Sequence, residues 1–221
     1  MVILYTYKDG VYYNLNNISL EEMNKQGIKN NIYVNLTNRC PCSCTFCLRQ
    51  TKEMTEQNCL WLKKEPTVEE VIAEFEKLDL SKYNEVIFCG FGEPTERLDD
   101  LLLVAKYLKN RRKEILIRIN SNGLSDLVNE KETAPLFKGL VDTMSISLNA
   151  STAEEYYRLT RSKFGIKSYE EIQKFAIACK KYIPHVVFTV VDCIGEEEIK
   201  ACQKVCDNLN IPLRVRAFEA N

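Results

Sequence analysis

Four cysteines lie within eight residues, 40-CPCSCTFC-47, and thiols at this density can bind a metal centre. Cys40, Cys44 and Cys47 have the spacing Cys-x3-Cys-x2-Cys, directly after an apolar alternating run at 31–38. Thiolates are soft ligands whose usual partners are zinc and iron–sulfur clusters. A structural zinc site closes with four protein ligands, whereas an iron–sulfur cube on three thiolates keeps one iron open for a small molecule. The residues around the loop must decide between these two centres.

The composition of the chain limits its partners. It has 221 residues, 45% hydrophobic and 28% charged, with a formal net charge of −1, which suits one large domain or two small ones. Neither sign of charge dominates, so we expect no nucleic-acid partner. The N-terminus lacks the basic segment and long apolar core of a signal peptide, and no apolar run approaches the ~18 residues of a membrane span. We expect a cytoplasmic protein without a membrane segment.

The chain has ten cysteines, but the missing signal peptide argues against a disulfide framework. Cys193, Cys202 and Cys206 could hold a second cluster, because positions 202 and 206 share one face of a helix. No Cys-x2-Cys pair among these three supports that cluster, and free cysteine is a common buried apolar residue. The single histidine, His185, stands at the start of a predicted strand, where we expect a structural role.

The elements that must position the thiols alternate between strand and helix. A hairpin with the turn Lys8-Asp9-Gly10 is predicted at 2–16 and a short helix at 19–27. Core strands are predicted at 32–37, 85–90, 115–120, 142–148, 186–192 and 213–218, and helices at 68–80, 97–110, 124–139, 152–160, 168–182 and 196–209. This order predicts an α/β fold with a parallel sheet, either an open doubly wound sheet or part of a (β/α) barrel. Residues 1–30 form an extension in this scheme, and residues 31–221 form the core.

Ligands of such folds bind at the carboxyl ends of the strands, and the unusual residues gather there. The second core strand ends in a turn in which Gly90 and Gly92 permit close approach of the backbone and Pro94 stiffens the exit. Glu93 in that turn could accept hydrogen bonds from an ammonium group. The next two strands end in polar side chains suited to a pocket: Asn120, Ser121 and Asn122, then Ser145, Ser147 and Asn149.

These motifs resemble those of the radical S-adenosylmethionine (radical SAM) superfamily, whose signature is CxxxCxxC with an aromatic residue, here Phe46, before the third cysteine. The turn 90-GFGEP-94 is similar to the GGEP motif of that superfamily, with Phe91 at its second glycine. The resemblance implies a partial (β/α)6 TIM-like barrel. It also implies a [4Fe–4S] cluster on the three cysteines, with S-adenosylmethionine (SAM) on the open iron and Phe46 against the bound ligand.

The resemblance also implies which side chains surround SAM. Glu93 and its turn, with Gly90, Gly92 and Pro94, would hold the methionyl amino group. The remaining implied contacts are Ser121 and Asn122 with the methionyl carboxylate and ribose, Ser147 and Asn149 on the ribose side, Arg158 or Arg161 with the carboxylate, and Val190 and Val191 beside adenine.

Longer segments resemble the TatD-associated radical SAM family, named for its neighbourhood to a TatD-type hydrolase. They are YVNLTNRC, LWLKKEPTVEEV, FCGFGEPTERLDDLL, RINSNG and LFKGLVDTMSISLNA. The chain departs from that family by an insertion at about 14–30 and by Cys42, an additional thiol in the cysteine loop.

The resemblance implies an enzyme that cleaves SAM reductively to methionine and a 5′-deoxyadenosyl radical, which takes hydrogen from an unknown substrate. An external flavodoxin or ferredoxin of low potential would supply the electron. The open side of a short barrel suits a large substrate. In its compact size the chain resembles glycyl-radical-enzyme activases and 7-carboxy-7-deazaguanine synthases. The alternatives are a non-catalytic iron–sulfur electron carrier and a zinc-bound interaction module. Neither alternative explains Glu93 or the polar strand ends.

Overall fold

The computed structural model describes residues 2–51 and 59–218. These residues form two compact units, one made of residues 2–39 and 59–119 and the other of residues 40–51 and 120–218. The chain passes from the first unit to the second between Arg39 and Cys40 and again between Ile119 and Asn120. Both crossings fall beside residues that the sequence marks as candidates for a site.

The first unit is built on five strands, in the order β2-β1-β3-β4-β5. Strand β1 pairs antiparallel with β2 and β3, whereas β3, β4 and β5 are parallel. Its elements are β1 (Leu4–Lys8), β2 (Val11–Asn14), α1 (Leu20–Lys25), β3 (Asn31–Val34), α3 (Val68–Glu76), the 3-10 helix η1 (Leu80–Lys82), β4 (Glu85–Phe88), the 3-10 helix η2 (Pro94–Arg97), α4 (Leu98–Arg111) and β5 (Leu116–Ser121), the last up to Ile119.

Local sequence signals explain the beginning of this unit. Asp9 and Gly10 have φ of 46° and 81°, as the two central residues of a type I′ hairpin turn require. Helix α1 begins at a capping box in which the Ser19 and Glu22 side chains each bond the backbone of the other. The predicted hairpin and short helix are both confirmed. Because β1 pairs with β3, the hairpin extends the sheet of the first unit.

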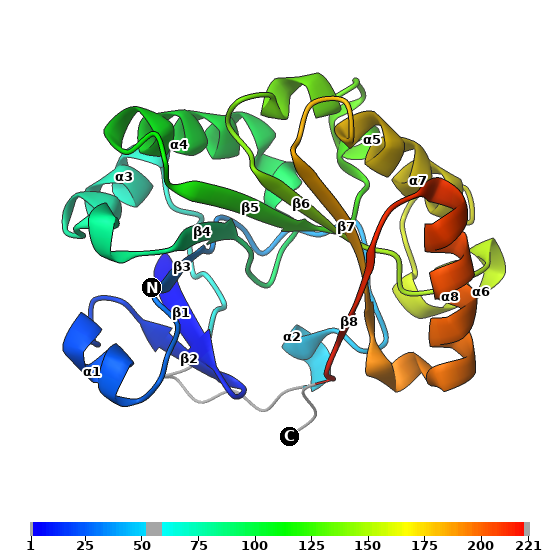
Figure 1. Cartoon of the computed structure of the whole chain (residues 1–221), viewed down its shortest axis with the longest axis horizontal. Helices are drawn as coiled ribbons and strands as arrows, with labels where there is room; N and C mark the ends of the chain where they lie inside the picture. The colour runs from blue at the N-terminus through cyan, green and yellow to red at the C-terminus, as the bar shows by residue number, and fades with distance from the viewer. Residues whose placement is uncertain (1, 52–58, 219–221) are drawn as a thin grey trace. The chain divides into compact units, whose positions relative to one another are not determined.

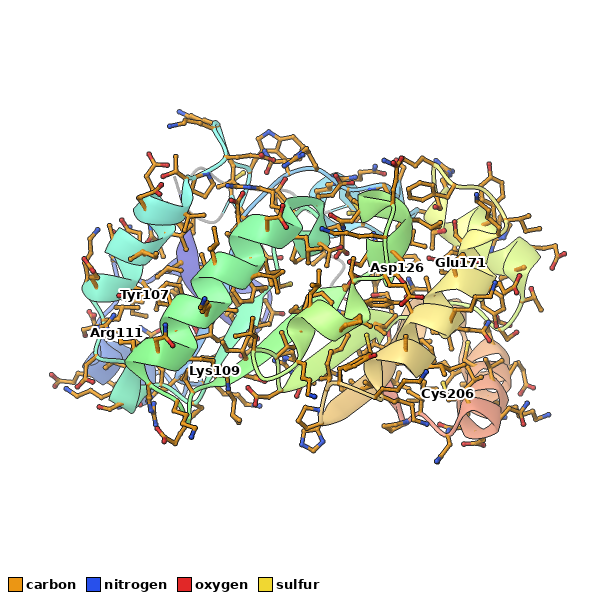
Figure 2. The ribbon with its side chains drawn as sticks, turned by 90° about the horizontal axis from the view of Figure 1, so that it is seen from above. Tyr107, Lys109, Arg111, Asp126, Glu171 and Cys206 are labelled. Carbon is orange, nitrogen blue, oxygen red and sulfur yellow. The ribbon has the colours of Figure 1, made fainter. Side chains whose placement is uncertain are left out.

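Helices α3 and α4 lie together on one face of the parallel strands of this unit (Figure 1). Both bury an apolar stripe, with Phe75 of α3 and Leu101 of α4 fully buried. Arg111, labelled in Figure 2, donates to the carbonyl oxygens of Phe75 at 2.6 Å and Leu78 at 2.8 Å. The end of α4 therefore adds hydrogen bonds to carbonyl groups at and just after the end of α3, where helical bonding stops.

The second unit carries three parallel strands in the order β6-β7-β8. Helices α7 and α8 pack on them (Figure 1). Its elements are α2 (Leu48–Thr51), α5 (Ser125–Asn129), the 3-10 helix η3 (Ala134–Phe137), β6 (Thr143–Ser147), α6 (Ala153–Thr160), α7 (Ser168–Cys179), β7 (His185–Val191), the 3-10 helix η4 (Asp192–Ile194), α8 (Glu196–Leu209) and β8 (Leu213–Arg216). The predicted α/β class is confirmed, because parallel strands covered by helices dominate both units.

The three cysteines considered for a second cluster lie outside the loop. Cys202 and Cys206, the latter labelled in Figure 2, are fully buried in α8, whereas Cys193 is exposed. Burial raises the pKa of the Cys206 thiol to about 11, so it stays protonated at neutral pH. Cys202 and Cys206 therefore act as buried apolar side chains.

Some predicted boundaries move. The helix predicted at 68–80 ends at Glu76. The helical region at 124–139, for which Pro135 predicts an interruption, divides into α5 and η3 after Glu130, which has φ of 53°, and Pro135 lies within η3. The strand predicted at 32–37 ends at Val34, because the next residues bond a separate segment of the chain. Within the described residues, no helix has both the length and the apolar character needed to cross a membrane.

Candidate functional site

The cysteine loop is held by backbone hydrogen bonds from the end of α6 and the residues after it. Three bonds, each 2.9 Å long, join Ser43 to Thr160, Thr45 to Leu159 and Lys163 to Pro41. The Arg49 guanidinium adds a bond of 3.0 Å to the carbonyl oxygen of Cys42. The backbone of the loop is therefore fixed on both sides of Cys42, and the directions of its thiols follow from that path.

Cys42 lies at the centre of the thiol group. Its side chain is 4% exposed, whereas Cys40, Cys44 and Cys47 are partly exposed. Hydrogen bonding of the Cys42 thiol with Cys40 and Cys44 raises the pKa of Cys42, and burial adds to the effect. The same hydrogen bond lowers the pKa of Cys44, against the opposing effect of burial. The proton thus stays on Cys42, and Cys44 has the greater thiolate character.

The third predicted ligand ends the loop. The Cys47 N–H donates to the carbonyl oxygen of Cys44 at 3.1 Å, and its own carbonyl accepts from Gln50 at 2.8 Å as α2 begins. Burial raises the pKa of the Cys47 thiol, and Arg49 opposes the increase. Phe46, in the turn between the second and third ligands, is partly exposed. Phe46 therefore directly precedes the last thiol in the chain and is open to solvent on part of its surface.

The chemistry of this donor set fits an iron–sulfur cluster. Three thiols at the spacing of the motif are partly exposed and the fourth is buried, and soft sulfur ligands are what such clusters require. Over the described ranges, no three Cys, His, Asp or Glu side chains already stand at metal-binding positions. The loop thiols instead bond one another through Cys42. Cluster binding releases protons from the ligand thiols, because thiolates are the form that binds iron.

The strand end after β5 brings an amide to the thiols. The Asn122 Nδ2 lies 3.8 Å from Cys40 Sγ and 3.9 Å from Cys42 Sγ. Ser121 is buried, and its Oγ accepts from the Gly123 N–H at 3.0 Å. A Cβ on Gly123 would lie 2.7 Å from Ile146, so this turn requires glycine. Both predicted residues lie at the strand end, and Asn122 is directed toward the cysteine loop.

The ends of β6 and β7 carry the other predicted contacts of the second unit. Ser147 pairs in register with Thr189, and Val191 ends β7 with 6% exposure. Asn149 has φ of 61° and is 4% exposed, and its Oδ1 has no hydrogen-bond partner within the described residues. A buried amide oxygen in this strained conformation suits a ligand contact. Thr189, which sequence reasoning missed, is buried on the same face as Ser147.

The two candidate arginines differ in their surroundings. Arg158, on α6, donates through Nε to Glu155 at 2.7 Å, and its side chain is 66% exposed. Arg161 ends the same helix in a left-handed conformation with φ of 48° and is exposed. Glu155 already holds the guanidinium of Arg158 on the surface, so Arg161 is the better candidate for a carboxylate.

In the first unit, the turn 90–95 is fixed against the strand exit. The Glu93 N–H donates at 2.8 Å to the carbonyl oxygen of Arg39, the residue directly before Cys40. A Cβ on Gly92 would lie 2.3 Å from the Thr37 carbonyl oxygen, so only glycine allows this approach. The Glu93 side chain is 3% exposed and its Oε1 accepts from the Thr95 hydroxyl at 2.8 Å, and Pro94 begins η2.

Gly90 and Phe91 of the same turn also have defined contacts. A Cβ on Gly90 would lie 2.2 Å from the Asn35 Oδ1. Phe91, which replaces a glycine of the motif, is 8% exposed and packs edge-on to Tyr12 with ring centroids 6.3 Å apart. The substitution is therefore matched by the N-terminal hairpin, which supplies Tyr12 as a packing partner.

Sequence reasoning missed a network that joins the strand-exit segment, residues 35–39, to residues 59–66. Asn38 accepts from the Leu62 N–H at 3.0 Å and donates to the Leu62 carbonyl at 2.7 Å. Asn35 donates to the Leu60 carbonyl at 2.6 Å. Glu65 accepts from Thr37 and, through two bonds, from the Arg39 guanidinium. The motifs YVNLTNRC and LWLKKEP carry these residues, and the polar side chains within both were the available signal.

Comparison with known proteins agrees with the cysteine and glycine motifs described above. The family model described as "Radical SAM superfamily" matches residues 34–205, more than half of the chain. A "Probable GTP 3′,8-cyclase" of Thermococcus kodakarensis is 27% identical over 171 residues, 76% of this chain and 50% of that protein. The "GTP 3′,8-cyclase" of Corynebacterium glutamicum is 30% identical over 140 residues, 61% of this chain and 34% of that protein.

Among solved structures, Streptococcus suis SuiB bound to S-adenosylmethionine superposes with a TM-score of 0.62 at 15% identity, over 91% of this chain and 44% of SuiB. At this identity the superposition shows a shared fold. The chain spans half or less of the length of each of these three proteins. The match of the family model over 34–205 assigns the chain itself. The chain belongs to the radical SAM superfamily, a superfamily of enzymes whose cofactors are a [4Fe–4S] cluster and S-adenosylmethionine.

Proposed function

We propose that this chain is a radical SAM enzyme of the TatD-associated family, built on a partial (β/α)6 barrel with residues 1–30 as an extension of a 31–221 core. The observation that carries the proposal is the hydrogen bond from Glu93 to the carbonyl of Arg39. That carbonyl belongs to the peptide bond that leads into Cys40, so the carboxylate turn is tied to the start of the cysteine loop.

Cys40, Cys44 and Cys47 are the cluster ligands in this proposal. When bound, the cluster supplies the electron that cleaves SAM to methionine and a 5′-deoxyadenosyl radical, which takes hydrogen from the substrate. The protein contributes binding and orientation of the cofactors and exclusion of water. The low pKa of Cys44 favours the thiolate form that binds iron.

The side chains around SAM follow from the strand ends. The buried carboxylate of Glu93, with Gly90, Gly92 and Pro94 shaping its turn, accepts hydrogen bonds from the methionyl ammonium group. Ser121 and Arg161 bind the methionyl carboxylate. The side-chain oxygen of Asn149 accepts a hydrogen bond from a ribose hydroxyl, and the hydroxyl of Ser147 donates one to the ribose. Val191 lies against the adenine and Phe46 beside the cluster. Arg158 has a secondary place because Glu155 holds it.

The partners of the enzyme are proposals of the same kind. The electron comes from an external flavodoxin or ferredoxin of low potential. The two relatives named for GTP are matched over half or less of their length, so GTP is not carried over to this chain. The cytoplasmic location stays a prediction.

Anaerobic reconstitution with iron and sulfide, followed by dithionite and SAM without substrate, tests the proposal. We expect slow formation of 5′-deoxyadenosine, and its loss in Cys44→Ala together with the loss of iron. Cys179→Ala is the matched control, because that thiol is fully buried in α7. It should keep both iron and activity.

The possible failures of this experiment separate the alternatives. A protein that holds a full cluster and binds no SAM is an electron carrier. A protein that retains zinc in place of iron is a structural module. Either outcome rejects the proposed function.

A further inference from the structure

The amide of Asn122 has a defined orientation. Its Oδ1 accepts from the Leu124 N–H at 2.9 Å, the hydrogen bond of an Asx turn. The reversed amide would place two donors against each other, so Nδ2 must be the end that faces the thiols. Nδ2 lies within hydrogen-bonding reach of sulfur for both Cys40 and Cys42, at 3.8 and 3.9 Å.

The backbone at Cys42 has a fixed position, and the Cys42 Sγ lies by the same Asn122 amide as the Cys40 Sγ, which makes its thiol a second candidate donor. It is 4% exposed, and the Arg49 guanidinium bonds its carbonyl oxygen at 3.0 Å. The neighbouring Ser43 N–H is bonded to Thr160 at 2.9 Å. The backbone thus holds Cys42 on the inner side of the loop, while the three cysteines of the motif are partly exposed. This position suits Cys42 as a hydrogen-bond donor and the three partly exposed cysteines of the motif as ligands.

We propose that Asn122 and Cys42 donate hydrogen bonds to the sulfurs of the cluster ligands and raise the reduction potential of the cluster. The inference rests on the proposed function, because it takes Cys40 and Cys44 as ligands. One-electron reduction adds negative charge to the cluster and its sulfurs. Donors beside those sulfurs stabilise the reduced state more than the oxidised state. Both residues are positioning residues, and Asn122 acts on the cluster instead of on SAM.

Asn122→Asp is the sharpest test, because the aspartate keeps an oxygen for the Leu124 N–H and replaces the donor by a negative charge. The variant is reconstituted anaerobically and titrated without SAM, with the reduced cluster measured by electron paramagnetic resonance. At the wild-type midpoint potential we expect the ratio of reduced to oxidised cluster to fall at least tenfold. For one electron this corresponds to about 59 mV.

Two further variants separate charge from hydrogen bonding. Asn122→Ala removes the donor without adding charge, and we expect a smaller fall in the ratio, about threefold. If the charge of Asn122→Asp prevents cluster assembly, Asn122→Ala carries the test. Gln173→Glu is the matched control, because it makes the same amide-to-carboxylate change on α7 of the same unit. Its ratio should stay within twofold of the wild type.

Cys42 is tested by iron content as well as by potential. Cys42→Ala should keep the iron and sulfide of the wild type and lower the ratio severalfold. Cys42→Ser keeps a donor and should stay nearer the wild type. Loss of the cluster in Cys42→Ala would show that Cys42 is a ligand and would overturn its role as a donor.

The outcomes distinguish this inference from the function beneath it. A wild-type protein that assembles no cluster rejects the proposed function. A wild type with a full cluster, together with Asn122 variants of unchanged potential, rejects only the inference. Weaker SAM binding in those variants without a change in potential would return Asn122 to the SAM site.

Discussion

The two units fix their candidate residues by opposite means. In the first unit, side chains fix backbone: Asn35 and Asn38 bond residues 59–66, and the strand exit beside them receives the turn of Glu93. In the second unit, backbone fixes side chains, because the amides of residues 43 and 45 hold the loop that carries the thiols. The turn of the first unit therefore depends on a backbone path that leaves no room for larger residues. The loop of the second unit depends on the chemistry of the few side chains that it carries.

This difference predicts where mutations act. Changes in the first region should alter stability and, through it, activity. Changes in the second should alter cofactor binding and leave the fold in place. Five substitutions test that division.

Gly92→Ala should have the largest effect, because the added Cβ would meet two backbone oxygens, at 2.3 Å from Thr37 and 2.6 Å from Arg39. Backbone cannot rotate away as the end of a side chain can. We expect the free energy of unfolding to fall by about 3 kcal/mol. Thermal unfolding should show this as a Tm lower by about 6–12 °C, at ~2–4 °C per kcal/mol for a chain of this size.

Gly139→Ala is the control for that substitution. The added Cβ meets nothing within 4 Å, so only the φ of 74° opposes it. That conformation costs about 1 kcal/mol for alanine. Equal losses at both glycines would contradict a role for close approach in the first region.

Asn38→Ala should have the next largest effect. It removes two hydrogen bonds to Leu62, of 2.7 and 3.0 Å, and leaves a partly buried N–H and carbonyl without that partner. We expect a loss of about 1–3 kcal/mol and faster hydrogen exchange at the Leu62 amide. Asn16→Ala, which removes one exposed hydrogen bond to Glu74, should change stability by less than ~0.5 kcal/mol. Unchanged exchange at Leu62 would show that other contacts hold residues 59–66.

Glu65→Gln should have a smaller effect that depends on pH. Burial opposes ionisation, but hydrogen bonds from Thr37 and Arg39 hold the pKa of Glu65 below its ordinary value of 4.5. A carboxyl with a lowered folded-state pKa stabilises the fold above its unfolded pKa. That contribution is lost as the pH falls from about 4.5 through the folded value.

The wild type should therefore lose more stability than Glu65→Gln on acidification below that pH. The difference should stay within ~0–1 kcal/mol, because solvent screens a partly exposed ion pair. Acid unfolding monitored by circular dichroism measures it, with the exposed Glu114→Gln as control. Parallel acid unfolding of wild type and Glu65→Gln would count against the ion pair.

Arg158→Ala should have the smallest effect of all. The side chain is exposed and bonded to Glu155, so we expect an unchanged Tm and less than a twofold change in the Kd for SAM. Arg161→Ala should raise that Kd about tenfold, the ~1.4 kcal/mol scale of one charge-assisted hydrogen bond. Equilibrium binding to the reconstituted protein measures both. The reverse order would assign the carboxylate to Arg158.

Much of the fold was predictable from local signals. Asp9-Gly10 predicts its turn, Ser19 and Thr67 predict the starts of α1 and α3, and the alternation of strands and helices predicts the α/β class. These signals act between residues close in sequence, where backbone conformation and capping decide the outcome. Boundaries were less certain. Strand β3 stops at Val34 because Asn35 and Asn38 bond a segment far along the chain.

The candidate site was predictable in composition but not in arrangement. The spacing of Cys40, Cys44 and Cys47 and the Glu93 turn identify the superfamily, and the family model agrees. The place of Cys42 behind the other thiols could not be predicted, because it depends on backbone bonds from residues 159, 160 and 163. The role of Asn122 was likewise open, since its strand end alone does not say which ligand its amide faces.

The sequence by itself determined the chemistry available to this protein, because residue type and spacing supply the three thiols and the carboxylate of Glu93. It also determined the class of fold, because hydrophobic period and caps act over short distances. The tertiary structure alone decided that the Cys42 thiol is buried and that the Asn122 amide faces sulfur. It also decided that the backbone leaves no room for a side chain at Gly92. Those outcomes depend on contacts between residues far apart in the chain, and such contacts exist only in the folded protein.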